Sequence, residues 1–187
     1  VQNNYPDQGM NAELERVEGG FGVTPQQHFH GLRNLLPQLK GLAILDNDGR
    51  DRKGIQDGPL KISYWKRYEA ENYFITPDVL RAYARAHYAD LELFDGFQQD
   101  IDEVLNDLIL EQVFDGLFVD FQAWVNATPE VARVLWEAKT ERRKLSTFAE
   151  EFFRRLAQQL SGQMLLKKGE LHRLVGYVNP QSISAEV

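Results

Sequence analysis

The spacing of apolar and polar positions divides the chain into a first part with strands and a second part made of helices. The unbroken apolar run at 41–45, bounded by Gly41 and Asp46, predicts a strand over 39–46 that is buried on both faces at the centre of a small, mainly parallel sheet. Residues 60–65 alternate and are rich in strand-forming types, which predicts a second strand. The polar, highly charged stretch 50–58 between them is expected to be a loop.

Helix-start signals recur where threonine precedes proline, at Thr24, Thr76 and Thr128. They predict helices over 24–36, from 76 to about 87, and from 128 onward, and apolar periodicity predicts others from 97, over 118–125 and around 148–164. For the helix that begins at Thr24, the expected buried stripe is Phe29, Leu32, Leu35 and Leu36. For the helix that begins at Thr128, it is Val131, Val134, Leu135 and Ala138. The pattern therefore predicts an α/β core over 1–87 and a helical region over 88–187 that packs on it.

Composition narrows the class of protein. The 187 residues are 43% hydrophobic, which suffices for a packed core. The sequence has no cysteine, which excludes disulfides, thiolate metal sites and cysteine nucleophiles. No apolar run approaches the roughly 20 residues that cross a bilayer, so we expect no membrane partner and a cytoplasmic location. Because the chain begins at Val1 without methionine and ends in a segment typical of a helix start, we expect it to be a fragment of a longer protein.

The net charge of −7 is distributed unevenly along the chain. Residues 1–87 carry 11 acidic and 11 basic side chains, residues 88–132 carry 11 acidic and none basic, and residues 133–187 carry 6 acidic and 10 basic. An acidic segment is unsuited to contact with nucleic acid, so 88–132 is expected to face solvent or a protein partner. The basic last segment is compatible with nucleic-acid binding only if its basic face lies near the site, and most segments of this kind are solvated helix faces.

The candidate chemistry lies in two carboxylates, Asp46 and Asp48, at the end of the first strand. Hard oxygen ligands in this arrangement suit Mg²⁺ or Mn²⁺, whereas Asn47-Asp48-Gly49 is also good turn chemistry, so a metal site and a charged turn are both open. A haloacid-dehalogenase-type phosphatase is less favoured, because Arg50 stands where that motif continues with threonine or valine. An EF-hand calcium loop is excluded, because Gly49 comes too early.

Several motifs in order resemble a Toprim-type nuclease domain of the group associated with ABC-type ATPases, related to the overcoming-lysogenisation-defect nucleases. They are a glycine-rich segment (19–22), the helix over 24–36, Asp46-x-Asp48, the stretch Glu69-Ala70-Glu71-Asn72-Tyr73, and Pro77-Asp78. A weaker likeness covers Lys167-Lys168-Gly169. The family places an essential glutamate well upstream of its Asp-x-Asp. Glu18 stands only one helix before it, so we expect the first strand of the fold to be missing, with Glu18 as that glutamate the alternative.

The resemblance implies a metal-dependent nuclease that hydrolyses phosphodiesters of DNA or RNA and acts in phage defence. It implies Asp46, Asp48 and Glu71 as ligands of Mg²⁺ or Mn²⁺, with Glu69 and Lys167 as catalytic residues. It also implies an ABC-type ATPase as partner, in cis or in trans, and allows a homodimer. With the upstream glutamate absent, the chain alone is expected to be inactive. The alternative is a non-catalytic Toprim-like module that regulates or assembles an ATPase.

Overall fold

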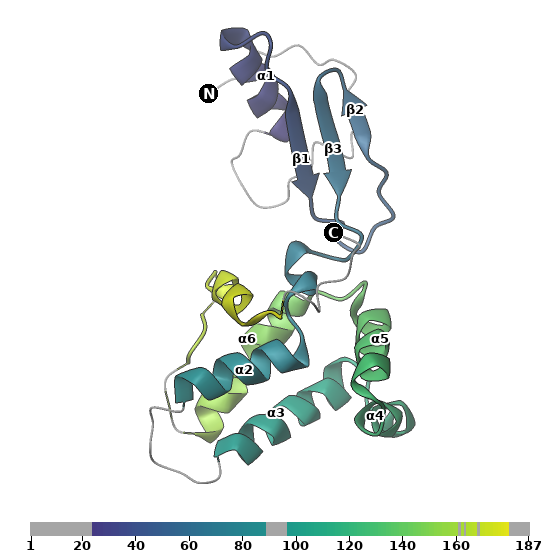
Figure 1. Ribbon diagram of the computed structural model, residues 1–187, viewed down its shortest axis with the longest axis vertical. Coiled ribbons are helices and arrows are strands. Elements are labelled where there is room, and N and C mark those ends of the chain that lie inside the picture. Colours follow the sequence, from purple (N-terminus) through teal and green to yellow (C-terminus); the bar gives the residue numbers. More distant parts are fainter. Residues whose placement is uncertain (1–23, 89–96, 161, 163, 168, 180–187) are drawn as a thin grey trace. The chain divides into compact units, whose positions relative to one another are not determined.

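The computed structural model describes residues 24–88, 97–160, 162, 164–167 and 169–179. These residues form a mixed α/β protein that is mostly helical, as Figure 1 shows, so the coarse α/β prediction is confirmed. The chain divides into two compact units: the first comprises 1–45 and 52–64, and the second comprises 46–51 and 65–187. The boundary expected after residue 87 therefore falls inside the second unit.

The first unit contains a three-stranded sheet of β1 (Gly41–Leu45), β2 (Ile55–Asp57) and β3 (Leu60–Tyr64), in the order β1-β3-β2 (Figure 1). β1 pairs with β3 in parallel, but β2 pairs with β3 antiparallel, so the sheet is mixed. β3 is the central strand, and the strand predicted to be central lies at an edge of the described sheet. The predicted loop 50–58 contains β2, because Gly58, at φ 56°, allows a two-residue turn that pairs Asp57 with Leu60.

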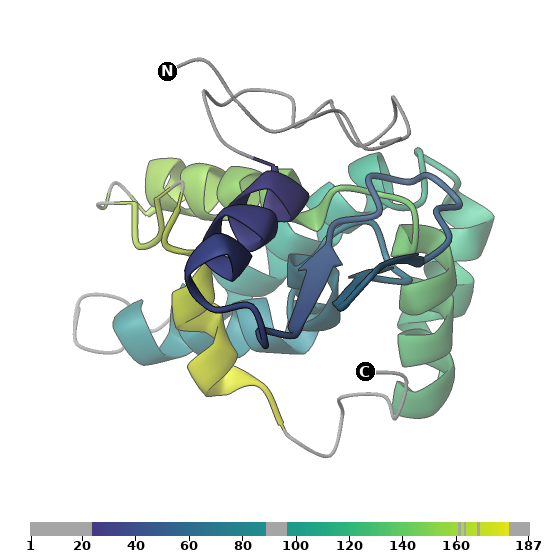
Figure 2. The same cartoon turned by 90° about the horizontal axis from the view of Figure 1, so that it is seen from above.

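One helix, α1 (Pro25–Leu35), packs on one face of this sheet (Figure 2). Its predicted capping box is present: Gln27 N–H donates to Thr24 Oγ1, and Thr24 N–H donates to Gln27 Oε1. Phe29 packs against the backbone at Gly41, where an added Cβ would lie 2.6 Å from its ring. Phe29 forms the small core of this unit with Leu60 and Ile62.

Two burial predictions for the first unit are wrong. In α1 only Phe29 of the expected stripe is buried, and the other three, Leu32, Leu35 and Leu36, are exposed. β1 is not buried on both faces, because α1 covers one face only and alternation directs Leu42 and Ile44 to the other, where they are 63% and 47% exposed.

The second unit is helical. Its α-helices are α2 (Pro77–Tyr88), α3 (Phe97–Gln112), α4 (Phe118–Val125), α5 (Pro129–Thr140) and α6 (Leu145–Gln159). Its described residues also include the 3₁₀-helices η2 (Ala70–Tyr73) and η3 (Leu171–Tyr177). The core lies mainly between α2, α3 and α6, which Figure 1 shows side by side, and includes Tyr83, Leu105, Phe152 and Phe153. Each helix predicted in this region is present, including that at 118–125, but the helix predicted around 148–164 spans Leu145–Gln159, so Leu160 and Met164 lie beyond its end.

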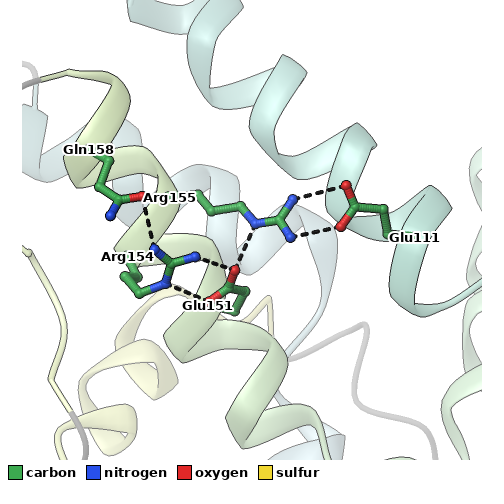
Figure 3. A network of polar contacts seen from close by, with 5 residues as sticks. All are labelled: Glu111, Glu151, Arg154, Arg155 and Gln158. Carbon is green, nitrogen blue, oxygen red and sulfur yellow. Dashed lines mark hydrogen bonds and ion pairs between the residues drawn. The ribbon is translucent and has the colours of Figure 1, made fainter.

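Four of the acidic residues in the described part of 88–132 form ion pairs within the second unit. Arg155 of α6 forms a bidentate pair with Glu111 of α3 (2.7 and 3.1 Å) and also contacts Glu151, which Arg154 binds as well (Figure 3). These two arginines lower the pKa of Glu151 to about 2. Elsewhere Arg81 binds Asp102, Arg143 binds Asp115 and Lys139 binds Asp120. Intramolecular ion pairs thus account for part of the negative charge of this segment.

The orientation of α5 is the reverse of the predicted one. Trp136 and Thr140 are its buried residues, at 2% and 1% exposure, whereas Val131 and Val134 of the predicted inward stripe are about half exposed. Among the described helices, none is both long enough and apolar enough to span a membrane.

Candidate functional site

The candidate carboxylates Asp46 and Asp48 lie in a tight turn that belongs to the second unit. Asp48 and Gly49 have φ of 52° and 70°, and Arg50 N–H donates to Asn47 O at 3.0 Å. Two successive positive φ values closed by such a bond are typical of a type I′ turn, for which Asn-Asp-Gly is well suited. At Gly49 an added Cβ would also lie 3.1 Å from the Tyr68 ring. The prediction that this segment is a turn is therefore confirmed, and the alternative prediction, that its carboxylates bind a metal ion, stays a prediction.

This turn is attached to the segment that leads into η2. Ala70 N–H donates to Asp46 Oδ1 at 3.2 Å, Asp48 N–H donates to Tyr68 O at 2.9 Å, and Asn47 Nδ2 donates to Lys66 O at 3.3 Å. Asp46 thereby satisfies the first N–H of η2, which the Glu69 side chain does not cap. The Asp-x-Asp segment and the Glu-Ala-Glu-Asn-Tyr segment, more than 20 residues apart in sequence, are in direct contact.

Glu69 is directed toward helix α6. Its side chain is 6% exposed, and Oε1 accepts a hydrogen bond from Ser146 N–H at 2.7 Å, in the first turn of α6. Burial raises the pKa of Glu69, and the nearby Glu71 raises it further, while hydrogen bonds to Ser146 and the charge of Lys144 lower it. The carboxylate predicted to be catalytic thus acts as a helix-terminal cap in this structure.

Asn72 and Arg67 fix the same segment to the connection between α5 and α6. Asn72 is fully buried; its Nδ2 donates to Thr140 O at 3.0 Å and Arg143 O at 2.8 Å, and its Oδ1 accepts from Leu145 N–H at 3.4 Å. Arg67 donates to Asn72 O at 2.8 Å and pairs with Glu137 at 3.2 Å. Sequence reasoning assigned neither residue a role. A signal was present, since Asn72 directly precedes the run Tyr73-Phe74-Ile75, and an asparagine that is buried requires hydrogen-bond partners.

Cationic residues near these carboxylates come from the α5–α6 connection. Lys144 is exposed and acts electrostatically on Glu69, and the Arg142 carbonyl lies beside Gly49. Arg143 is engaged with Asp115. Lys167, predicted to be catalytic, is exposed in a later segment, where its N–H donates to Glu170 at 2.9 Å; no contact described in the structure joins its side chain to Asp46, Asp48 or Glu71.

No preformed metal centre is found in the described part of the chain. No group of three or more histidine or acidic residues there is arranged so that it could hold an ion. Asp46 contacts the helix that contains Glu71, but the assignment of Asp46, Asp48 and Glu71 as metal ligands stays a prediction. Glu18, the glycine-rich segment, Lys168 and the last eight residues lie outside the described residues.

Comparison with known proteins adds no assignment: no family model, curated protein or solved structure matches this chain.

Proposed function

We propose that this chain is part of a metal-dependent nuclease, in which Asp46, Asp48 and Glu71 hold Mg²⁺ or Mn²⁺. The observation that supports the proposal most directly is the hydrogen bond from Ala70 N–H to Asp46, which joins the two carboxylate-bearing segments. The donor set is all oxygen and small, which suits Mg²⁺, an ion that retains several waters and takes the rest of its shell from substrate phosphate. Such an ion supplies Lewis-acid stabilisation of phosphate charge and a more acidic bound water.

The remaining residues take roles that follow from their surroundings. Lys144, exposed beside the Glu69 carboxylate, is placed to attract a phosphate to this edge of the second unit. Glu71 is only partly buried and neighbours Glu69 electrostatically, so it is better suited than Glu69 to act as a ligand. Glu69, whose pKa is raised, would act by positioning α6 and Lys144. Lys167 remains a candidate for neutralising charge on the phosphate. An ABC-type ATPase, in cis or in trans, is the proposed partner.

The second candidate function is a non-catalytic module that regulates or assembles an ATPase. The hydrogen bonds of Glu69 to Ser146 N–H and of Asn72 to Thr140 O favour it. Both residues belong to the motif that suggested catalysis, yet both are engaged in holding the fold together. The two candidates differ in one measurable property, which is metal-dependent cleavage of nucleic acid.

The first test is calorimetric titration of the chain with Mn²⁺. We expect weak binding that is lost in Asp46→Ala/Asp48→Ala, and equal binding by wild type and this double variant would refute the metal site. Asp46→Asn separates folding from chemistry, because its amide oxygen can still accept from Ala70 N–H while its charge is gone. It should keep the stability of the wild type and lose the metal.

The second test is cleavage of plasmid DNA and of structured RNA. We expect no cleavage by the chain alone and metal-dependent cleavage once the ATPase is supplied. Metal binding without cleavage under any nucleotide or partner condition would support the regulatory module instead.

A further inference from the structure

The described part of the first unit is basic, although the chain as a whole is acidic. Its residues 24–45 and 52–64 contain five lysines and arginines and one acidic residue, a net charge of +4 in a chain of −7. The acidic residue, Asp57, contacts His30 at 2.8 Å, on the side of the sheet that α1 covers. Residues 1–23, which carry four acidic side chains and one basic, lie outside the described residues. The even charge of 1–87 in the sequence therefore includes a basic sheet.

The face of this sheet that α1 does not cover is identified by alternation along the strands. Apolar residues at alternate positions of 39–45 pack around Phe29 on the α1 side. The residues between them point to the opposite side. The register places Leu42 beside Lys61, and Lys61 beside Gln56. We use the name open sheet face for Lys40, Leu42, Ile44, Gln56, Lys61 and Ser63.

The open sheet face combines exposed cations with exposed aliphatic side chains. Neither Lys40 nor Lys61 forms an ion pair with any residue that the structure describes. Leu42 stands between them, because Lys40 is two residues earlier in the chain and Lys61 is its partner in β3. Leu42 and Ile44 are both exposed, and none of the six residues is acidic. Such a face is complementary to an anion that also carries flat apolar groups.

The size of the open sheet face distinguishes among anionic partners. With strands about 4.8 Å apart and five residues of about 3.3 Å each, it measures roughly 10–15 Å by 17 Å, or about 200 Å². A protein partner of standard size covers about 800 Å² on each side. A few nucleotides of an extended strand need less, because phosphate contacts supply most of their affinity. The area therefore favours a nucleic-acid strand over an acidic protein.

The aliphatic side chains favour a single strand over a duplex. A duplex keeps the faces of its bases stacked inside, so Leu42 and Ile44 could contact only its backbone. Unpaired bases leave their faces free to lie on side chains while the phosphates meet cations.

We propose that the open sheet face binds single-stranded nucleic acid, with Lys40 and Lys61 contacting phosphates and Leu42 and Ile44 contacting base faces. This role rests on the proposed nuclease function, to which it adds the form of the substrate and the residues that contact it. Asp46 follows β1 directly, so the open sheet face and the proposed metal ligands are adjacent along the chain. Two phosphate contacts predict weak affinity, about 10–100 µM, and a slope of about −1.4 for log affinity against log salt.

The test is fluorescence anisotropy of labelled oligo(dT) and oligo(rU) of about 12 nucleotides, titrated with the full chain in EDTA. Affinity should fall about sevenfold from about 50 to about 200 mM salt. Lys61→Glu should weaken binding at least fivefold. Arg33→Glu is the matched control, because it changes the net charge equally but lies on α1, and it should weaken binding less than twofold. Leu42→Ala should weaken binding about threefold without changing the salt slope, since it removes no charge.

Circular dichroism checks that each variant is folded, and Lys61→Arg, which keeps the charge, should bind like the wild type. Three results would overturn the proposal: no binding at low salt, equal weakening by Lys61→Glu and Arg33→Glu, or a duplex of the same length bound as tightly as the single strands. Competition by polyglutamate as strong as by unlabelled oligonucleotide would also overturn it and indicate an acidic protein partner. Binding that appears only after removal of residues 1–23 would indicate instead that this acidic segment occupies the face.

The absence of metal in this assay separates the proposal from the metal site. Oligonucleotide binding in EDTA without Mn²⁺ binding in calorimetry would support the open sheet face and refute the metal ligands. Mn²⁺ binding without oligonucleotide binding would refute the open sheet face alone.

Discussion

Replacing Asn72 by leucine removes the side chain that fastens η2 to the α5–α6 connection. The two side chains have the same number of heavy atoms and the same branching, but leucine is larger, so the change deletes the hydrogen bonds and also adds volume at a fully buried site. Two carbonyls, those of Thr140 and Arg143, lose a donor at 3.0 and 2.8 Å, and Leu145 N–H loses a longer bond at 3.4 Å. Thr140 and Leu145 are buried, so water cannot readily replace these bonds.

A buried polar group left without a partner costs about 1–3 kcal/mol. With two good bonds and one weak bond lost, we expect Asn72→Leu to lower the free energy of unfolding of the second unit by about 3 kcal/mol. That is a large part of the roughly 5–15 kcal/mol that stabilises an ordinary domain. At a urea dependence of about 1.5 kcal/mol/M, the unfolding midpoint should fall by about 2 M.

Tryptophan fluorescence measures this change selectively, because Trp65, Trp124 and Trp136 all belong to the second unit. Asn126→Leu is the control, since Asn126 is exposed at the end of α4, and it should change stability by less than about 0.5 kcal/mol. If Asn72→Leu shifts the midpoint no more than this control does, the hydrogen bonds of Asn72 do not hold the segment and the structural role assigned to it is wrong.

Two further predictions concern ionisable residues of the second unit. Glu69→Ala should lower the free energy of unfolding by about 1–2 kcal/mol, because the hydrogen bond from Ser146 N–H is lost. Glu69→Gln keeps an acceptor for that bond and should not destabilise the protein at pH 7, because burial already favours the neutral form of the side chain. An equal loss of stability in both variants would contradict the capping role. The pKa of Glu151 is lowered to about 2, so its contribution to stability is present above its ordinary pKa of 4.5 and lost as the pH falls toward 2. Because the ion pairs of Glu151 with Arg154 and Arg155 are partly solvated, Glu151→Gln should lower the free energy of unfolding by only about 1 kcal/mol at pH 7. It should also flatten the fall in thermal stability at acid pH. A variant with the same acid profile as the wild type would refute the role assigned to Glu151.

Helix positions in this chain could be predicted from sequence because their signals are local. Threonine caps at 24 and 128, proline at the first helical position and regular apolar spacing depend only on neighbouring residues. β2 was missed because the local signal for a hairpin, the two-residue Gly58-Pro59 turn, lies within a stretch whose charges favoured a loop. The centre of the sheet was misplaced because an apolar run indicates strand but does not indicate which neighbours the strand has.

The candidate site shows a different limit. Asp46 and Asp48 were recognised from their spacing, and the contact of Asp46 with the Glu-Ala-Glu segment agrees with reading the two motifs together. Spacing could not show that Glu69 is directed to Ser146 N–H or that Asn72 spans 68 residues to Thr140. Such partners depend on tertiary structure. A motif therefore identifies residues that are constrained, but the constraint can come from folding, from chemistry or from both.

The reversed orientation of α5 follows from the same distinction. Its apolar stripe was predicted correctly as a stripe, but periodicity does not say which side of a helix the core occupies. Here the inner side is held largely by polar contacts: Glu137 pairs with Arg67, the carbonyl of Thr140 accepts from Asn72, and that of Glu141 accepts from Tyr68 N–H. Trp136 supplies most of the apolar burial on that side. Because these contacts fix α5 without its valines, the apolar stripe remains outside.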